Sequence, residues 1–433
     1  MTVTMVTVMA TILSLDFAAL GAGVLGGLAG VMVVLTGTLG LEVLLALLPG
    51  HAARGGPRSG QSPGGAPDLT WEHLRVAVLV PAHNEALLIG PTLGAIVPQL
   101  KPQDRVIVVA DNCEDETAAL ARSAGATVLE RHDLDRRGKG YALDYGLRVL
   151  QADPPDVLLI VDADCHCHPG SLPTLAHTAH QTQRPIQSLY LLDSPPDPSL
   201  KDLISAFAMT VKNGVRMRGL GRVGWPCPLG GTGMAFPWAA LATVDLASGH
   251  IVEDMKLGLD LAIAGYPPLF WGGAKVTGSL PSGRAASTSQ RTRWEHGHLQ
   301  VLRDYVPVLF ATALRQGRID LGVMALDLAI PPLSLLVLLW VGLAIATGLL
   351  AVLGGSGLPL VLMAIAGGLL FSAIAVAWAG FARDQLPAHK LLAIPLYILW
   401  KIPLYFRFLI KPQSAWVRTQ RDRPQGEKET RSQ

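Results

Sequence analysis

The segment Val157-Leu158-Leu159-Ile160-Val161-Asp162-Ala163-Asp164 carries the most informative pattern in the 433-residue chain. Its five consecutive apolar residues predict a short strand buried on both faces of a sheet. Two carboxylates follow where that strand ends, and a spacing of two places them on one side of an extended backbone. Such a pair repels itself unless a cation lies between, and hard oxygen ligands suit Mg²⁺ or Mn²⁺. Asp162 and Asp164 therefore form a predicted metal site.

Three earlier apolar runs alternate with helical patterns, which predicts a mostly parallel sheet with helices on both faces. The runs are residues 76–80, 106–110 and 126–129, and the helical patterns are residues 116–124 and 141–150. Ligands of such sheets bind beyond the carboxyl ends of the strands. The residues that follow the first two runs include Pro81 and the polar His83, Glu85 and Asp111. We therefore expect a ligand site at this edge of an α/β domain.

Two carboxylates, Glu253 and Asp254, open a helical pattern over residues 255–264. One interpretation is that they only complement the positive end of the helix macrodipole. The other is that a carboxylate here takes a proton from an attacking hydroxyl, as a general base does.

Two further segments carry groups suited to phosphate. Gln290, Arg293 and Trp294 share one helical face, where the arginine could neutralise a departing diphosphate and the indole could line a sugar-sized pocket. The alternative is an amphipathic helix at a membrane boundary. Lys139 lies between Gly138 and Gly140, which would let backbone approach a phosphate, although the segment lacks the spacing of a P-loop.

Both ends of the chain predict membrane segments. Half of the residues are hydrophobic and only 16% are charged, against roughly 25% in soluble domains. Residues 18–48 exceed the ~20 residues needed to cross a bilayer, with a buried core helix as the alternative. Residues 328–353 and 358–381 predict a transmembrane hairpin. Residues 391–410 are apolar but contain two basic residues and two prolines, so they either cross or lie in the interface, and we prefer the interface.

Basic residues flank these segments on one side, which by the positive-inside rule places residues 51–320 in the cytosol of a bacterial-type inner or plasma membrane. They are Arg54, Arg58, Arg75, Arg303, Arg315, Arg318, Arg383 and Lys390. A net charge of only +2 provides no basic surface for nucleic acid. The four cysteines do not form a disulfide framework, and the segment Cys165–His168 has a spacing too tight for one zinc ion.

In this order, four elements resemble the motifs of membrane-bound family 2 glycosyltransferases, the group with cellulose, chitin and hyaluronan synthases: Asp111, the Asp162-Ala163-Asp164 triplet, the Glu253–Asp254 pair and the Gln-x-x-Arg-Trp pentad at 290–294. The likeness covers residues 76–304. It implies a GT-A fold, a Rossmann-like nucleotide-diphosphosugar domain, inserted between transmembrane helices. It also implies a Mg²⁺ or Mn²⁺ cofactor, a nucleotide-sugar donor with a UDP-sugar preferred, and inversion by direct displacement. Val252 departs from the threonine frequent in the family.

The resemblance assigns roles to individual residues. The catalytic carboxylates would be Asp254, as general base, and Glu253. The metal ligands would be Asp162 and Asp164. The donor-binding residues would be Pro81, His83, Glu85, Asp111, Lys139, Asp162, Gln290, Arg293 and Trp294. The acceptor side would be formed by Gly231, Thr232 and Trp294.

The expected organisation has seven parts. They are an N-terminal transmembrane helix (1–50), a linker (51–74), the cytosolic catalytic domain (75–305), an interfacial segment (306–327), the transmembrane hairpin (328–381), an interfacial or third C-terminal membrane helix (382–412) and a basic cytosolic tail (413–433).

The resemblance favours sugar transfer to a growing polysaccharide at the inner face of the membrane, with single-sugar transfer to a polyprenyl-linked or other lipid acceptor as the alternative. A non-catalytic export subunit and a nucleotidyltransferase are the other classes considered. Because about three spanning helices offer little wall for a pore, any channel would need another copy or an export subunit.

Overall fold

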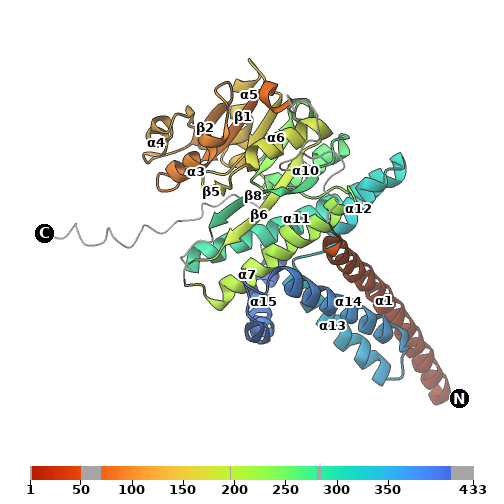
Figure 1. Cartoon of the computed structure of the whole chain (residues 1–433). Coiled ribbons are helices and arrows are strands. Elements are labelled where there is room, and N and C mark those ends of the chain that lie inside the picture. Colours follow the sequence, from red (N-terminus) through yellow and green to blue (C-terminus); the bar gives the residue numbers. More distant parts are fainter. Residues whose placement is uncertain (1, 50–69, 196, 280–283, 411–433) are drawn as a thin grey trace.

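The computed structural model describes residues 2–49, 70–195, 197–279 and 284–410, which form an α/β domain and a helical bundle (Figure 1). Most of the predicted linker (51–74) and the whole predicted basic tail (413–433) lie outside the described residues.

The α/β domain is built on an eight-stranded mixed sheet with the order β3-β2-β1-β4-β7-β6-β8-β5 (Figure 1). The four predicted strands are confirmed and pair in parallel, whereas β7 runs antiparallel between β4 and β6. The strands are β1 (Val76–Ala82), β2 (Arg105–Asp111), β3 (Thr127–Arg131), β4 (Val157–Ile160), β5 (Cys165–Cys167), β6 (Ile186–Asp193), β7 (Met234–Pro237) and β8 (Leu269–Ser279).

Helices cover both faces of this sheet, as the continuous apolar strands predicted. Along β1, Val78 and Val80 face one core, while Leu79 faces the other. The first core is covered by α3 (Ile89–Ile96), α4 (Thr117–Ser123) and α6 (Ser171–Thr182), and the second by α5 (Lys139–Leu150), α9 (Trp238–Leu241) and α10 (Glu253–Ile263). Burying each such valine or leucine contributes about 1.5–3 kcal/mol, so both faces of the strand stabilise its register.

A layer of helices lies between the sheet and the bundle (Figure 1). It consists of α7 (Leu200–Met209), the π-helical turn η2 (Thr210–Arg216), α8 (Met217–Arg222), α11 (Arg284–Gln316) and α12 (Ile319–Ala329). The expected boundary between residues 305 and 306 falls inside α11, which continues across it.

Within the described ranges, four helices are long and apolar enough to span a membrane: residues 21–47, 333–352, 358–381 and 388–410. They belong to α1 (Thr2–Leu47), α13 (Leu333–Val352), α14 (Leu358–Phe381), and η3 with α15 (Ala388–Ala393 and Ile394–Ile410). The hairpin begins at Leu333 rather than at residue 328, because Pro331 and Pro332 follow the end of α12.

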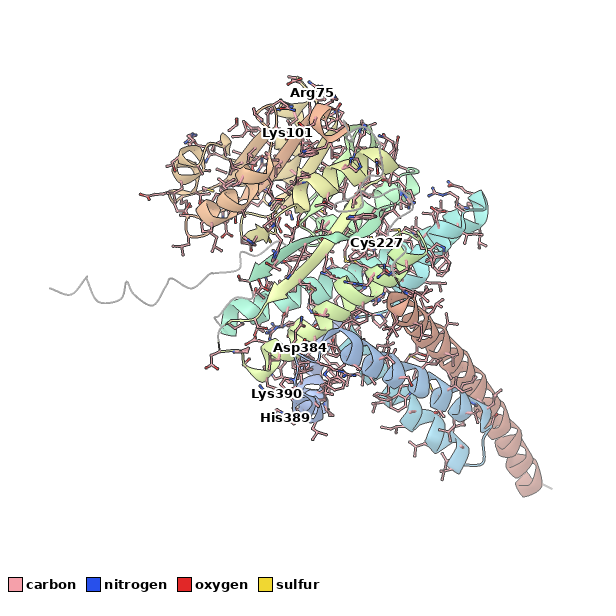
Figure 2. All side chains as sticks on the ribbon, viewed as in Figure 1. Arg75, Lys101, Cys227, Asp384, His389 and Lys390 are labelled. Atoms are coloured by element: carbon pink, nitrogen blue, oxygen red, sulfur yellow. The ribbon has the colours of Figure 1, made fainter. Side chains whose placement is uncertain are left out.

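The bundle is formed by α1, α13 and α14, which pack on one another and on α7 and η2. In Figure 1, these three helices extend away from the α/β domain, whereas α15 lies beneath α7 and is viewed almost along its axis. Figure 2 places the polar residues Asp384, His389 and Lys390 beside α15, near the domain end of the bundle.

Candidate active site

The loops after β1 and β2 are locked together by hydrogen bonds. Asn84 and Asn112 adopt left-handed backbone conformations with φ of 54° and 52°, which asparagine tolerates better than most residues. The Asn84 side-chain oxygen accepts from the Glu114 backbone N–H at 2.7 Å, and His83 Nδ1 lies 2.6 Å from the Asp111 carbonyl oxygen. The chain therefore presents His83 and Asp111 from adjacent strand ends, as the sequence predicted.

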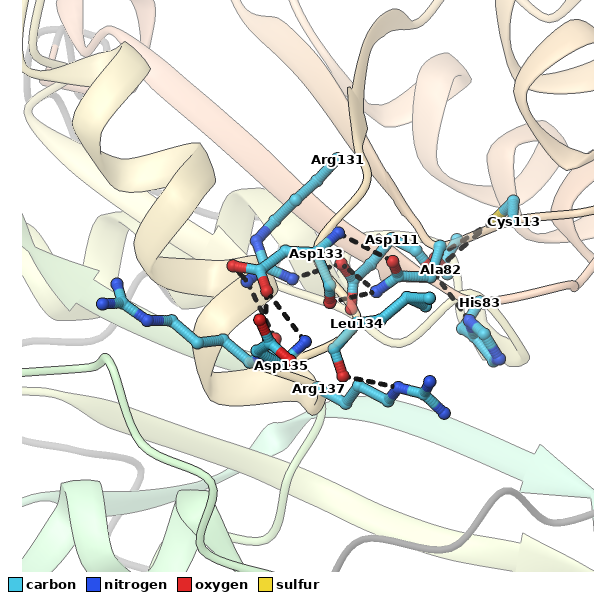
Figure 3. Close-up of polar contacts among 11 residues, drawn as sticks. Ala82, His83, Asp111, Cys113, Arg131, Asp133, Leu134, Asp135 and Arg137 are labelled. Atoms are coloured by element: carbon cyan, nitrogen blue, oxygen red, sulfur yellow. Dashed lines mark hydrogen bonds and ion pairs between the residues drawn. The ribbon is translucent and has the colours of Figure 1, made fainter.

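Asp111 belongs to a buried charge network (Figure 3). Arg131 Nη1 donates to Asp111 Oδ1 at 2.6 Å, and the same guanidinium contacts Asp133 at 3.0 Å. Burial raises the pKa of Asp111 above its usual value, although Arg131 opposes that shift. One carboxylate oxygen of Asp111, a predicted donor-binding residue, is thus held by Arg131, which the sequence interpretation did not include.

The Asp162-Ala163-Asp164 triplet brings two carboxylates and a thiol together. Oxygens of Asp162 and Asp164 and the sulfur of Cys165 lie within 4.8 Å of one another. The prediction that both carboxylates lie on an extended strand was wrong, because β4 already ends at Ile160. A turn brings these groups together instead. In that turn, the Cys165 N–H donates to the Asp162 carbonyl at 3.1 Å.

This cluster fits a divalent cation through its carboxylates. Burial raises the pKa of Cys165 well above its usual value, so the thiol stays neutral and contributes little to a hard ion. The two carboxylates supply the hard oxygen ligands that Mg²⁺ and Mn²⁺ prefer. Cys165 and Cys167 are buried within β5, which agrees with a structural role for the Cys165–His168 segment.

Lys139, at the start of α5, joins three of the predicted motifs. Its ammonium pairs with Asp162, lies 3.6 Å from Glu253 Oε1 and donates to the Gly231 carbonyl at 2.5 Å. Burial lowers the pKa of Lys139, but the surrounding carboxylates outweigh burial and raise it above its usual value. The positively charged ammonium of Lys139 therefore lies among the carboxylates of the acidic cluster.

Glu253 and Asp254 occupy the first turn of α10, so both the helix-end and the active-site interpretations describe their position. Burial raises the pKa of Glu253 to about 7, against the opposing charge of Lys139. Asp254 lies against Gly231, whose φ is 93°; a Cβ added there would lie 3.1 Å from Asp254 Oδ2. Glycine at this position therefore leaves room for the carboxylate.

The two predicted acceptor-side residues of the glycine segment differ in position. Gly231 lines the cavity described below, whereas Thr232 is fully buried. Thr232 Oγ1 accepts from the Asp162 backbone N–H at 3.0 Å. Thr232 thus holds the backbone at Asp162, and because it does not line the cavity, direct contact with an acceptor is not supported for it.

The Gln-x-x-Arg-Trp pentad lies in α11, and Gln290, Arg293 and Trp294 all line the same cavity. Arg291 is buried and anchors the pentad to α7 through an ion pair of 2.7 Å with Asp202. The sequence did not predict this ion pair, because Asp202 lies 89 positions before Arg291 in the chain.

Most of the predicted site residues line one cavity of about 860 Å³. Its polar end is lined by residues of the strand ends and the triplet, among them Pro81, His83, Glu85, Asp111, Asp162 and Asp164. Its middle is lined by Lys139, Glu253, Asp254, Arg293 and Trp294. Its other end is lined by apolar side chains of α1, α13, α14 and α15, namely Leu39, Val337, Ile374 and Ile394.

Buried charges tie the bundle to this site. Arg216 of η2 binds Glu42 of α1 at 2.7 Å and Asp327 of α12 at 2.6 Å. Lys401 of α15 pairs with Glu295, which follows the pentad. Glu42 thus faces neighbouring elements, as expected for a charged residue in an apolar helix.

A family model described as "Glycosyltransferase like family 2" matches residues 73–297, slightly more than half of the chain. Curated relatives named 4,4'-diaponeurosporenoate glycosyltransferase, from Staphylococcus aureus strains MRSA252 and N315, are 45% identical over 76 and 73 residues. These segments cover 18% and 17% of this chain. The chain thus matches 20% and 19% of the length of these relatives.

Two solved structures also resemble the chain. A mannosyltransferase from Pyrobaculum calidifontis, in complex with GDP-Man and Mn²⁺, is 20% identical with a TM-score of 0.48 and covers 89% of this chain and 95% of its own. Glucosyl-3-phosphoglycerate synthase from Mycobacterium tuberculosis, in complex with Mg²⁺ and UDP, is 21% identical with a TM-score of 0.34 and covers 52% and 80%.

Proposed function

The chain belongs to the glycosyltransferase-like family 2, and from that premise we propose that it transfers one sugar from a nucleotide-diphosphate sugar to a lipid acceptor. The expected fold, a GT-A domain accompanied by apolar helices at both ends, is confirmed. The observation that carries the proposal is the single cavity that joins the acidic strand ends to apolar side chains of four membrane-type helices.

The donor would occupy the polar end of the cavity. Asp111 and His83 would flank the nucleoside, and Asp162 and Asp164 would hold a divalent cation against the diphosphate. That cation, when bound, would neutralise negative charge on the diphosphate. Arg293, which lines the same cavity, would add a fixed positive charge beside the departing nucleoside diphosphate.

Asp254 would act as the general base. It would take the proton from an acceptor hydroxyl, whose oxygen then attacks the anomeric carbon. The bond from that carbon to the diphosphate breaks, the nucleoside diphosphate leaves with the electron pair, and the anomeric configuration inverts. Direct displacement needs only this one base, so the neighbouring Glu253, whose Oε1 lies 3.6 Å from Lys139 Nζ, has no nucleophilic role in the proposal.

The acceptor class follows from the far end of the cavity. Leu39, Val337 and Ile374 offer no hydrogen bonds to a polysaccharide, but they suit the chain of a lipid. The staphylococcal relatives are named for a lipid-type acceptor, which is compatible with this choice. We therefore favour single transfer to a lipid over the growing polysaccharide that the Gln-x-x-Arg-Trp pentad alone suggested.

The membrane arrangement belongs to the same proposal. The catalytic domain would lie in the cytosol, on the side of Arg75, Arg303, Arg315, Arg318, Arg383 and Lys390. α15 would lie in the interface, because it runs transverse to the bundle in Figure 1. Its Tyr397 hydroxyl also lies 3.0 Å from Ser205 of α7, and its Lys401 is buried against α11.

The test is a donor screen with purified protein in lipid nanodiscs, measuring nucleoside diphosphate release and product mass. We expect one nucleotide-sugar to be consumed only with Mg²⁺ or Mn²⁺ and a lipid product that gains one sugar. Asp254→Asn should lower kcat by about 10²–10⁴-fold, while Asp260→Asn on the same helix, outside the cavity, should retain activity.

Three outcomes would contradict the proposal. Products with many added sugars would indicate a polysaccharide synthase. Release of pyrophosphate would indicate a nucleotidyltransferase. Undiminished turnover in Asp254→Asn would remove Asp254 from the chemistry.

A further inference from the structure

Lys212 lies at the junction between the acidic site and the apolar end of the cavity. It belongs to the π-helical turn η2, and its neighbours Val211 and Val215 pack into the core of the bundle. Its own side chain lines the cavity instead, with Nζ 4.0 Å from the sulfur of Met255, the residue after Asp254. π-Helical turns often occur at functional sites because they redirect a side chain.

Within the described part of the chain, this ammonium has no ion pair. Besides Asp254, the carboxylates that act on it are Asp327, which Arg216 engages, and Glu295, which Lys401 engages. Burial lowers the pKa of Lys212 below its usual value, and the Asp254 carboxylate only partly offsets that effect. A buried ammonium whose only hydrogen-bond contact, in the ranges that the structure describes, is the weak acceptor sulfur of Met255 is costly, so it lowers the stability of the acceptor-free protein.

His298 of α11 supplies a second, independent sign of a ligand. Its side chain is 5% exposed, lines the same cavity, and its Nε2 finds no hydrogen-bond partner among the described residues. Burial lowers the pKa of His298, and the charge of Lys212 adds to that effect. A neutral histidine beside an unpaired ammonium forms a donor pair suited to an anion.

We propose that Lys212 and His298 bind an acidic group, a carboxylate or a phosphate, on the head of the lipid acceptor. The group would lie beside the hydroxyl that Asp254 deprotonates, and the lipid chain would continue between Leu39, Val337 and Ile374. This inference rests on the proposed function and deepens it by naming the chemistry of the acceptor.

The experiment compares three sixteen-carbon lipids that share a hydroxyl on the second carbon and differ only at the first. The first carbon bears a hydroxyl in one lipid, is the carboxylate carbon in the second and bears a phosphate in the third. Each is presented in nanodiscs with the donor that the screen selects, and transfer kinetics are measured. We expect the acidic lipids to have a KM at least tenfold below that of the neutral diol, and the better of the two identifies the acid.

Lys212→Met should raise the KM of the acidic lipids at least tenfold and leave that of the diol unchanged. Lys212→Arg, which keeps the charge, should retain the preference. The control is Lys201→Met, which removes an exposed lysine of α7 that stacks on Trp400, 3.8 Å from the ring centroid, and should change neither value.

Stability provides a separate readout. Because Lys212→Met removes an unpaired, desolvated charge, it should raise the Tm of the acceptor-free protein, whereas loss of a merely structural lysine would lower it. A lowered Tm would contradict the inference even if the variant could not be assayed.

The possible failures are distinguishable. Two results would overturn the proposal of an acidic head group but leave the proposal of a lipid acceptor standing. One is an equal KM for all three lipids in the wild type, and the other is an equal rise in KM for the diol and the acidic lipids in Lys212→Met. Reduced donor hydrolysis without any acceptor in Lys212→Met would place Lys212 on the donor side. Transfer to none of the lipids would contradict the proposed function itself.

Discussion

Replacing Arg216 by methionine is expected to lower the free energy of unfolding by about 3–5 kcal/mol. The reason is that Arg216 is the shared partner of two carboxylates from distant parts of the chain. Its Nε lies 2.7 Å from Glu42 Oε2, and its Nη2 lies 2.6 Å from Asp327 Oδ1. These two side chains are 3% and 5% exposed, so the methionine variant would leave both charges buried and uncompensated.

The size of this loss in unfolding free energy depends on the burial of the ion pairs, and an arginine in an exposed ion pair provides the matched control. Arg148 also binds a carboxylate, Asp144, at 2.8 Å, but the arginine side chain is 64% exposed. Arg148→Met should therefore cost only about 0.3–0.5 kcal/mol, the usual contribution of an exposed pair one helical turn apart. The two variants thus remove the same side chain from pairs of similar length and differ mainly in solvation.

The assay is chemical unfolding in detergent micelles, followed by tryptophan fluorescence. A third variant, with Glu42→Gln, Arg216→Met and Asp327→Asn together, should recover most of the lost stability because no buried charge remains. The reasoning would be refuted if Arg216→Met lost no more than Arg148→Met. It would also be refuted if the triple variant were as unstable as the single one.

The other predictions concern the active site. Gly231→Ala should lower kcat at least tenfold, because position 231 has a left-handed backbone and the new methyl group would crowd Asp254. The control is Gly265→Ala, where φ is 100° but the added methyl group meets open space, and kcat should not change. Equal losses of kcat in the two variants would argue against the contact with Asp254. Glu253 holds its proton more tightly when folded, since burial raises its pKa from 4.5 to about 7. Stability should therefore fall as pH rises between these values, and Glu253→Gln should flatten the Tm profile over that range; parallel profiles would contradict the shift. Chelation with EDTA should abolish sugar transfer, and added Mn²⁺ or Mg²⁺ should restore it in the wild type but not in Asp164→Asn. Full activity in EDTA would show that transfer needs no divalent cation.

The parallel half of the sheet was predictable from the sequence because its strands are continuous apolar runs. β6 and β8 were not, since polar residues and the adjacent Gly272 and Gly273 interrupt their patterns. The antiparallel β7 between β4 and β6 depends on pairing across distant parts of the chain, for which a single sequence carries no local signal.

The candidate site was predicted as a set of motifs, but its internal contacts were not. Lys139 was expected near the nucleotide, yet its position among Asp162, Glu253 and Gly231 arises from contacts across much of the domain. Lys212 carried no signal at all, because a π-helical turn has no distinct sequence period. The roles of these residues stay predictions until the variants are measured.

The cavity that runs from Asp162 to Leu39 has a kinetic consequence for a lipid substrate. An acceptor that enters among α1, α13 and α14 is diluted by its neighbouring lipids rather than by water. The transfer rate would then follow the mole fraction of acceptor in the bilayer, and adding inert phospholipid at constant total acceptor would slow it. Membrane composition would thereby regulate this chain without any change in the concentrations of enzyme or donor.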